Sequence, residues 1–262
     1  RGYSDEFVEW PHQMRQPDGT LEPWDRKATN SDVPCALEAR DTDTAFTSRK
    51  AIKFLEDPPD DPWMLFLSWY RPHQPYSPPE PYFRMYPPES VPPPNRSEAE
   101  WHDPHPIWRH QVEPYEHLTP EEDYWRWMRS AYYGLIAELD HWVGRVVDTL
   151  EKKGMADNTL IIFTSDHGDY LCDHWLFGKE SFYDEAHRVP LILVDPSEEA
   201  TETRGTTSDQ WVQLVDLLPT MVDWLGGQPE LEIQGRSLLP FLRGEQPDDW
   251  RTEVYAMWDH RE

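Results

Sequence analysis

The chain has 262 residues, enough for one large domain, and carries a net charge of −26 from 50 acidic and 24 basic residues. This excess of negative charge argues against a nucleic-acid partner, because nucleic acids bind through basic surfaces. No apolar run approaches the ~20 residues of a membrane-spanning helix, and two cysteines cannot make a disulfide framework. A first residue other than Met and a last residue inside an apparent strand favour a fragment open at both ends. The location therefore stays open between cytoplasm and periplasm.

The first part of the chain predicts a surface loop and then a helix. Residues 1–40 lack a sustained period and contain several prolines, which is typical of irregular surface structure. A helix is predicted over residues 41–55, where apolar side chains recur at spacings near 3.6 and Asp41 or Thr42 can cap the first turn. The stretch D-P-P-D-D-P then ends this helix.

A continuous apolar run over residues 63–70, W-M-L-F-L-S-W-Y, predicts a central strand. The polar stretch R-P-H-Q-P-Y follows at its carboxyl end, where ligands bind in open α/β sheets. A lone histidine such as His73 is nevertheless more often a loop residue than a catalyst. Residues 77–118 continue without any period, which is typical of a long functional loop. The histidines of this loop do not have zinc-finger spacing, and they are His102, His105, His110 and His117.

A long helix is predicted from Thr119 to Lys153. Thr119 can serve as N-cap, Pro120 stands at the first helical position, and Gly154 ends the helix. One apolar stripe runs along it, formed by Ala131, Leu135, Leu139, Trp142, Val146 and Leu150. Because the helix connects the apolar runs at 63–70 and 160–163, a βαβ-like unit with parallel strands is predicted. Asp140 and His141, inside the helix, are interpreted as structural.

The stretch from 158 to 196 holds the candidate chemistry. Residues 160–163 predict a short buried strand, and residues 189–194 predict a second one. Asp166 and His167 follow the first strand, and Gly168 frees the backbone to turn there. An Asp at a strand end is usually a turn residue or helix cap, but an acid beside an imidazole is also a candidate metal site. Lys179 adds a cation that could hold an anionic substrate.

The last third of the chain predicts helices and one strand. A helix is expected from about 209 to 225, with a core face of Val212, Val215, Leu218, Val222 and Leu225. Gly226 and Gly227 end it. A short helical piece is expected at 235–240 and a strand at 253–258.

The ordered set S-D-H-G-D-x-L-x-D-H-x-L-F-G-K, followed by F-Y-D-E-A-x-R-V-P-L-I-L, resembles the second metal-binding segment of the sulfatase family. This family belongs to the alkaline phosphatase superfamily, and the spelling is most similar to the branch of phosphonate monoester hydrolases and related arylsulfatases. The resemblance implies an α/β fold with a mixed, mainly parallel sheet flanked by helices, present here as a partial domain. Residues 42–225 would be its core, with the loop at 77–118, and residues 226–262 would begin a C-terminal part.

The same resemblance implies roles for individual residues. Asp166 and His167 would bind one divalent metal ion, and Lys179 would bind the sulfuryl or phosphoryl oxygens. The stretch R-P-H-x-P-Y resembles the family segment whose histidine contacts the leaving-group oxygen, so His73 is predicted to be catalytic and to bind substrate. His174 is predicted to bind substrate. If the two strands are parallel, their carboxyl ends would place His73 and Lys179 at one crevice.

Metal and nucleophile are only partly specified. Carboxylate plus imidazole suits Mn²⁺, whereas the wider family mostly uses Ca²⁺, which prefers oxygen ligands; both stay open. The family's nucleophile is a formylglycine, made from a Cys or Ser in the sequence frame C/S-x-P/A-x-R. Neither cysteine of this chain lies in that frame: Cys35 is followed by A-L-E-A-R and Cys172 by D-H-W-L. Formylglycine and further acidic ligands are therefore expected upstream of this chain, and the chain alone is expected to lack esterase activity.

The leading functional hypothesis is a metal-dependent hydrolase of sulfate esters, of the arylsulfatase type. One alternative is a phosphonate monoester or phosphodiester hydrolase of the same family. A phosphotransferase or phosphomutase of the superfamily would need more metal ligands than the sequence offers. The non-enzyme alternative is a relative that binds anionic glycans. Substrates would be small-molecule or glycan sulfate or phosphate esters, and the oligomeric state is open.

Overall fold

The computed structural model describes residues 13–15, 21–23, 32–112, 122–228 and 232–257. Two compact units make up the chain. The first unit comprises Arg1–Lys153 and Asp169–Phe177, and the second comprises Gly154–Gly168 and Gly178–Glu262. The chain therefore passes from the second unit into the first directly after Gly168 and returns at Gly178.

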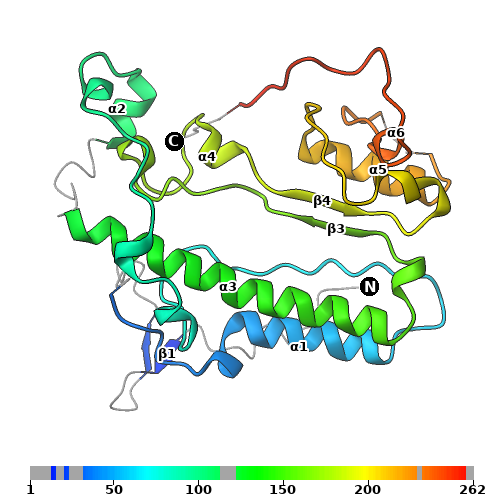
Figure 1. Cartoon of the computed structure of the whole chain (residues 1–262), viewed down its shortest axis with the longest axis horizontal. Coiled ribbons are helices and arrows are strands. Elements are labelled where there is room, and N and C mark those ends of the chain that lie inside the picture. The colour runs from blue at the N-terminus through cyan, green and yellow to red at the C-terminus, as the bar shows by residue number, and fades with distance from the viewer. Residues whose placement is uncertain (1–12, 16–20, 24–31, 113–121, 229–231, 258–262) are drawn as a thin grey trace. The chain divides into compact units, whose positions relative to one another are not determined.

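Two helices form the frame of the first unit, α1 (Asp43–Glu56) and α3 (Glu122–Lys152), and they lie side by side (Figure 1). Both confirm the predicted helices. The Thr42 hydroxyl caps α1 by accepting a hydrogen bond from the Ala45 amide at 3.1 Å. The predicted stripe of α3 is buried at Ala131, Leu135, Trp142 and Leu150. After the helix Gly154 adopts φ +69°, which confirms the predicted glycine stop.

The core of the first unit gathers on α3. Its buried members are Tyr76, Val91, Trp125, Met128, Ala131, Leu135, Leu171 and Cys172. The last two come from the short segment 169–177, so that segment is anchored on α3 although it lies far along the chain. Arg129, 7% exposed, reinforces this contact because its Nε donates to the Leu171 carbonyl at 3.1 Å.

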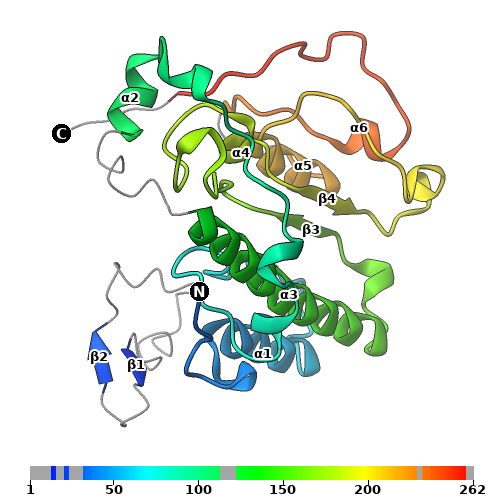
Figure 2. The same cartoon turned by 60° about the vertical axis from the view of Figure 1, so that its left-hand side comes forward.

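The first part of the predicted long loop, around residues 82–90, packs against α3 (Figure 2). Phe83 stacks on Trp127 with ring centroids 6.1 Å apart, and the Ser130 hydroxyl donates to the Tyr86 carbonyl. The loop contains the 3₁₀ turns η3 (Tyr82–Arg84), η4 (Pro88–Ser90) and η5 (Glu98–Trp101) and the helix α2 (Pro106–Val112). Another 3₁₀ turn, η2 (Ala39–Asp41), precedes α1. Aromatic packing therefore orders a segment that has no apolar period.

The predicted strand at 63–70 is wrong. This segment forms no strand ladder in the described part of the chain. Its side chains alternate as in a strand: Trp63 packs edge-on against Phe54 at 5.5 Å, whereas Met64 and Phe66 are 71% and 83% exposed. The extended backbone is thus present, but a ladder needs a neighbouring strand.

The loop predicted for residues 1–40 is contradicted at one place. Strands β1 (Gln13–Arg15) and β2 (Leu21–Pro23) pair antiparallel, with Met14 opposite Glu22. The other residues up to 31 lie outside the described residues.

The second unit contains the two predicted strands of the 158–196 stretch. Strand β3 (Ile161–Thr164) pairs with β4 (Leu191–Val194), with Ile161 opposite Val194. The pairing of β3 with β4 is antiparallel. The predicted parallel pairing of the segments 63–70 and 160–163 is not found among the described ladders. Burial is also less complete than predicted, since Ile192 and Val194 are 56% and 46% exposed.

The helix predicted from 209 begins later. Residues 214–216 form the 3₁₀ turn η10 (Leu214–Asp216), and α5 spans Leu217–Trp224. Pro219 explains the late start, because proline is tolerated only in the first turn of an α-helix. The predicted core face is wrong: Leu218 and Leu225 are 52% and 74% exposed, whereas Asp216 and Thr220 are fully buried.

The predicted strand at 253–258 is wrong over its described part. Residues 253–257 form no strand, and Tyr255 is 78% exposed. The short helical piece exists as α6 (Leu239–Leu242). The described part of the chain also contains η7 (Ala156–Asn158), η8 (Asp173–Trp175), α4 (Asp184–His187) and η9 (Glu198–Thr203).

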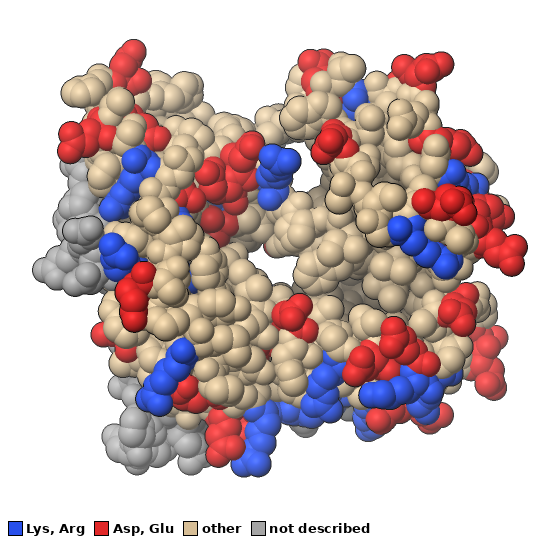
Figure 3. Space-filling model, viewed as in Figure 1, with Lys and Arg blue, Asp and Glu red and all other residues tan. Residues whose placement is uncertain are grey.

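On the face shown in Figure 3, charged side chains are spread out rather than gathered in one patch. Figure 3 shows acidic side chains interspersed with Lys and Arg over one face, as expected of a solvated acidic surface. Within the described residues, none of the helices has the length and apolar character needed to cross a membrane.

One buried carboxyl group should make stability depend on pH. Glu138 of α3 is 1% exposed and accepts a hydrogen bond from Thr42 Oγ1 at 2.5 Å. Burial raises the pKa of Glu138 to about 7, above its ordinary value of 4.5. The folded state therefore holds this proton more tightly than the unfolded state, and the free energy of unfolding should fall as pH rises from 4.5 through 7.

We expect Glu138→Gln to remove this dependence, because a neutral amide oxygen can still accept from Thr42. Relative to wild type, the variant should gain stability between pH 5 and pH 8, by up to roughly 3 kcal/mol. Urea unfolding at both pH values measures the change. Equal wild-type and variant pH profiles would contradict the assignment.

Candidate active site

Asp166 and His167 follow β3 directly, as predicted. Asp166 Oδ1 accepts from the His167 amide at 3.0 Å, and His167 Nδ1 lies 2.8 Å from the Gly168 carbonyl oxygen. A carbonyl can only accept, so Nδ1 carries the hydrogen and Nε2 carries the lone pair. This Nε2 lies 3.6 Å from Asp166 Oδ2. The Asp166 side chain is 85% exposed and that of His167 28%, so this pair reaches the surface of the second unit.

Gly168 is required here because of close packing. A Cβ atom at this position would lie 1.8 Å from the Glu185 carbonyl oxygen, and the Gly168 amide donates to the Ala186 carbonyl at 2.8 Å. Any side chain would push the backbone of α4 away from the turn. From the sequence, Gly168 was expected to let the backbone turn. In the structure, the close approach of the Glu185 carbonyl to Gly168 is what requires glycine at this position.

Lys179 joins the pair. Its Nζ lies 2.7 Å from His167 Nε2 and donates to the lone pair there. The preceding Gly178 adopts φ +70°, a conformation that favours glycine and helps return the chain to the second unit. An ammonium group, an imidazole and a carboxylate are therefore gathered at one point. The structure thus brings Lys179 and His167 together, while their roles remain predictions.

These residues have the donors that a divalent metal needs, although not the full number. Asp166 offers a carboxylate oxygen and His167 an imidazole nitrogen in the tautomer that binds metals. The described residues contain no group of three or more His, Cys, Asp or Glu arranged to hold an ion. The donor pair thus fits a metal whose remaining ligands come from other residues.

His73 lies in the first unit, in a turn after the extended segment. Its amide donates to the Tyr70 carbonyl at 3.2 Å, and its Nδ1 donates to the Gln74 carbonyl at 2.9 Å. The neighbouring Arg71 side chain, 10% exposed, donates to the Pro75 carbonyl and lies 3.5 Å from Asp43 Oδ1. The turn is therefore tied to the start of α1. Because Lys179 belongs to the other unit, a crevice shared with His73 remains a prediction.

His174 is held by a residue that sequence reasoning missed. Its Nδ1 lies 2.6 Å from Glu100 Oε1, and Trp108 Nε1 donates to its carbonyl at 2.8 Å. Glu100 is itself fixed, because its Oε2 accepts from the Ser97 amide at 3.0 Å. The pattern S-E-A-E is a capping box and could have indicated a fixed carboxylate, but nothing in the sequence links it to His174. Substrate binding by His174 stays a prediction.

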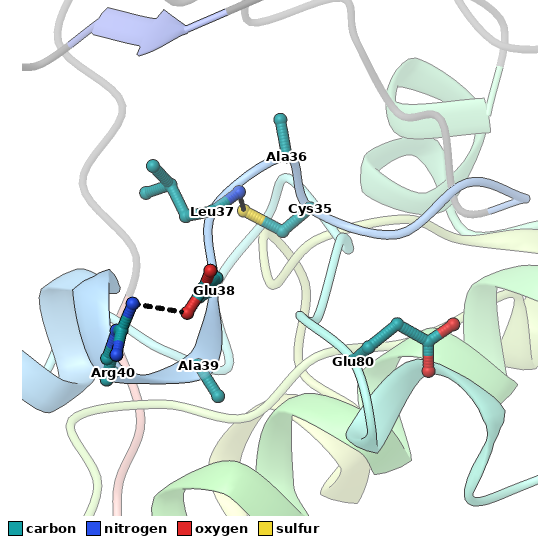
Figure 4. A pocket seen from close by; sticks show the side chains of 7 residues that line it. All are labelled: Cys35, Ala36, Leu37, Glu38, Ala39, Arg40 and Glu80. Atoms are coloured by element: carbon teal, nitrogen blue, oxygen red, sulfur yellow. Dashed lines mark hydrogen bonds and ion pairs between the residues drawn. The ribbon is translucent and has the colours of Figure 1, made fainter. Parts of the chain in front are cut away.

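Neither cysteine is placed as an activated nucleophile. Cys35 is 9% exposed at the edge of an open pocket lined by Ala36, Leu37, Glu38, Ala39, Arg40 and Glu80 (Figure 4). Burial raises the pKa of its thiol. Cys172 lies in the core, where burial raises its pKa to about 12. A reactive cysteine needs the opposite shift, which agrees with the missing formylglycine frame.

The other histidines of the loop form no further site in the described residues. His102, His105 and His110 belong to no cluster of potential metal ligands there. His117 lies outside the described residues.

The model of the family named Sulfatase matches residues 3–227 of this chain. The chain belongs to the sulfatase family. Members of this sulfatase family generally use a metal ion and a formylglycine. The predicted membership is therefore confirmed, as is the alkaline-phosphatase-like α/β fold as a partial domain.

Relatives and solved structures place the chain within the family. It is 36% identical over 249 residues to the multifunctional alkaline phosphatase superfamily protein PehA of Trinickia caryophylli, covering 88% of this chain and 47% of that protein. It is 30% identical to an arylsulfatase of Clostridium perfringens, covering 81% of this chain and 44% of the enzyme. The phosphonate monoester hydrolase of Silicibacter pomeroyi matches with a TM-score of 0.77 and 32% identity, over 95% of this chain and 49% of its own. This sulfatase-family chain thus spans about half the length of the relatives it matches.

Proposed function

We propose that this sulfatase-family chain supplies part of the active site of a metal-dependent hydrolase of sulfate esters, of the arylsulfatase type. The observation that carries the proposal is the contact of Lys179 Nζ with His167 Nε2 at 2.7 Å, beside the Asp166 carboxylate. Metal-binding donors and a cation at one exposed point suit an anionic ester, whose charge must be neutralised during hydrolysis.

Each residue has a distinct task in this proposal. Asp166 and His167 would hold the divalent ion, Ca²⁺ or Mn²⁺, whose binding would replace the Lys179 contact at His167 Nε2 and would supply a Lewis acid that polarises the ester oxygens. Lys179 donates hydrogen bonds to non-bridging oxygens and stabilises the charge that develops there. His73 gives a proton to the leaving-group oxygen. The nucleophile is the formylglycine expected outside this chain.

A second candidate, hydrolysis of phosphonate monoesters or phosphodiesters, is favoured by one observation. The phosphonate monoester hydrolase of Silicibacter pomeroyi aligns with nearly the whole chain at 32% identity. Sulfate and phosphonate monoesters both present anionic non-bridging oxygens, so Lys179 and the metal ligands suit either. Comparing kcat/KM of the whole protein for 4-nitrophenyl sulfate and for a phenyl phosphonate ester decides between them. Turnover of neither, with metal still bound, would favour a non-catalytic binder of anionic glycans.

We expect Asp166→Ala and His167→Ala each to lower the metal content of the whole protein and its esterase activity, while the fold persists. Strand-end ligands contribute little packing, as the 85% exposure of Asp166 indicates. Elemental analysis of the purified variants measures the metal. A matched control is Asp184→Ala, which removes a carboxylate that is 82% exposed and 3.9 Å from Arg188. Wild-type metal content in both ligand variants would overturn the assignment.

A further inference from the structure

One hydrogen bond joins the two sequence motifs of the proposed site. The Tyr76 hydroxyl donates to Asp169 Oδ2 at 2.6 Å, across 93 positions of the chain. Tyr76 lies in the same motif as His73, and Asp169 comes directly after Gly168 in the metal-binding motif. Both residues belong to the first unit. The sequence alone indicates no role for either residue beyond its place in its motif.

Both ends of this bond are anchored. Tyr76 is 2% exposed, and its ring packs edge-on against Tyr132 with centroids 5.9 Å apart. The other oxygen of Asp169 accepts from the Leu171 amide at 3.1 Å. Leu171 is in turn held by Arg129 of α3, which donates to its carbonyl at 3.1 Å. A displacement of either motif would therefore have to break a bond between two ordered segments.

The hydroxyl is not needed for packing. A buried phenylalanine would fill the same volume without the cost of removing a hydroxyl from water, so the polar atom is justified by its partner. Burial, and next to it the Asp169 carboxylate, raises the pKa of Tyr76 well above its usual range. Tyr76 therefore remains a hydrogen-bond donor at every pH at which the protein would work.

We infer that Tyr76 and Asp169 are positioning residues that hold the His73 turn and the segment following Asp166 and His167 in one arrangement. Their catalytic relevance rests on the proposed function, whereas the mechanical link does not. Tyr76 touches neither substrate nor metal in this account. It acts by holding the turn from which His73 would donate its proton.

Tyr76→Phe tests the inference by removing one oxygen atom. In the whole protein we expect kcat to fall about 10- to 100-fold with little change in KM, which is the size expected for a buried hydrogen bond to a charged group. Because the effect passes through His73, an alkyl ester should be slowed more than a 4-nitrophenyl ester. The double variant Tyr76→Phe/Asp169→Asn should be no slower than the slower single variant, because both changes act on the same bond. Additive losses, or equal slowing of both esters, would overturn the inference.

A second measurement is independent of activity. Hydrogen exchange followed by mass spectrometry should show faster exchange in Tyr76→Phe in two separate peptides, one around 70–77 and one around 167–177. The matched control is Tyr133→Phe, a tyrosine of α3 that packs against the same core, and it should change neither peptide in this way. Faster exchange around 70–77 alone would show that the bond does not link the motifs. If the wild-type protein hydrolysed neither ester, the proposed function would fail while the exchange experiment still decided this inference.

Discussion

Replacing Lys179 by alanine is expected to slow ester hydrolysis by about 10²–10³-fold, the usual consequence of losing one electrostatic donor from an active site. The Lys179 ammonium lies 2.7 Å from His167 Nε2, so it stands where it can neutralise an anion beside the proposed metal ligands. Its loss removes the charge whatever the leaving group is. Alkyl and 4-nitrophenyl esters should therefore be slowed by similar factors, measured as kcat/KM for the whole protein.

His73→Ala supplies the contrast for this experiment. A proton donor matters most when the leaving group is poor, so this variant should slow an alkyl ester more than a 4-nitrophenyl ester. Lys179→Arg keeps the charge and should recover part of the rate lost in Lys179→Ala. If Lys179→Ala retained more than about a tenth of wild-type activity, or showed the leaving-group dependence expected of His73→Ala, its assignment as the anion-binding residue would be wrong.

The elements that depend on local pattern could be predicted from the sequence. The apolar stripe of α3 can be recognised from its 3.6-residue period alone. The cap of α1 can be recognised from Thr42, whose hydroxyl can accept from the Ala45 amide three positions later. Asp166, His167 and Lys179 were found because strand ends carry ligands and because their motif resembles a known family. The described contacts bring these three together as the sequence indicated.

The elements that depend on distant partners could not be predicted in the same way. Residues 63–70 have the composition of a central strand, yet strand pairing depends on a neighbour that no local pattern identifies. The link between His174 and Glu100 crosses 74 positions and leaves no trace in the spacing of either residue. For α5 the apolar period predicted a buried face that includes Leu218 and Leu225, but both are exposed. The face that is buried carries Thr220 and lies next to the buried carboxylate of Asp216.

Asp216→Ala is expected to lower the free energy of unfolding of the second unit by about 3–5 kcal/mol, the typical cost of breaking a buried ion pair from one side. Asp216 is 0% exposed. Its carboxylate accepts two hydrogen bonds from the Arg251 guanidinium, at 2.7 and 2.8 Å, and one each from the Arg236 and Gln213 amides, at 2.9 and 2.8 Å. One side chain thus ties the start of α5 to two later segments, and its removal leaves several donors without an acceptor.

Urea unfolding of Asp216→Ala beside Asp223→Ala measures this cost. Asp223 lies on α5 and accepts a hydrogen bond from the Ser237 hydroxyl at 2.6 Å, but it is exposed, so its loss should cost less than about 1 kcal/mol. Arg251→Met should be costly on its own because it leaves the carboxylate uncompensated. The double variant Asp216→Leu/Arg251→Met, which removes both charges, should recover part of the stability, because an apolar pair carries no desolvation penalty. Strictly additive losses in the double variant would mean that Asp216 and Arg251 stabilise the unit independently. A cost below about 1 kcal/mol for Asp216→Ala would show that this carboxylate does not organise the buried face of α5.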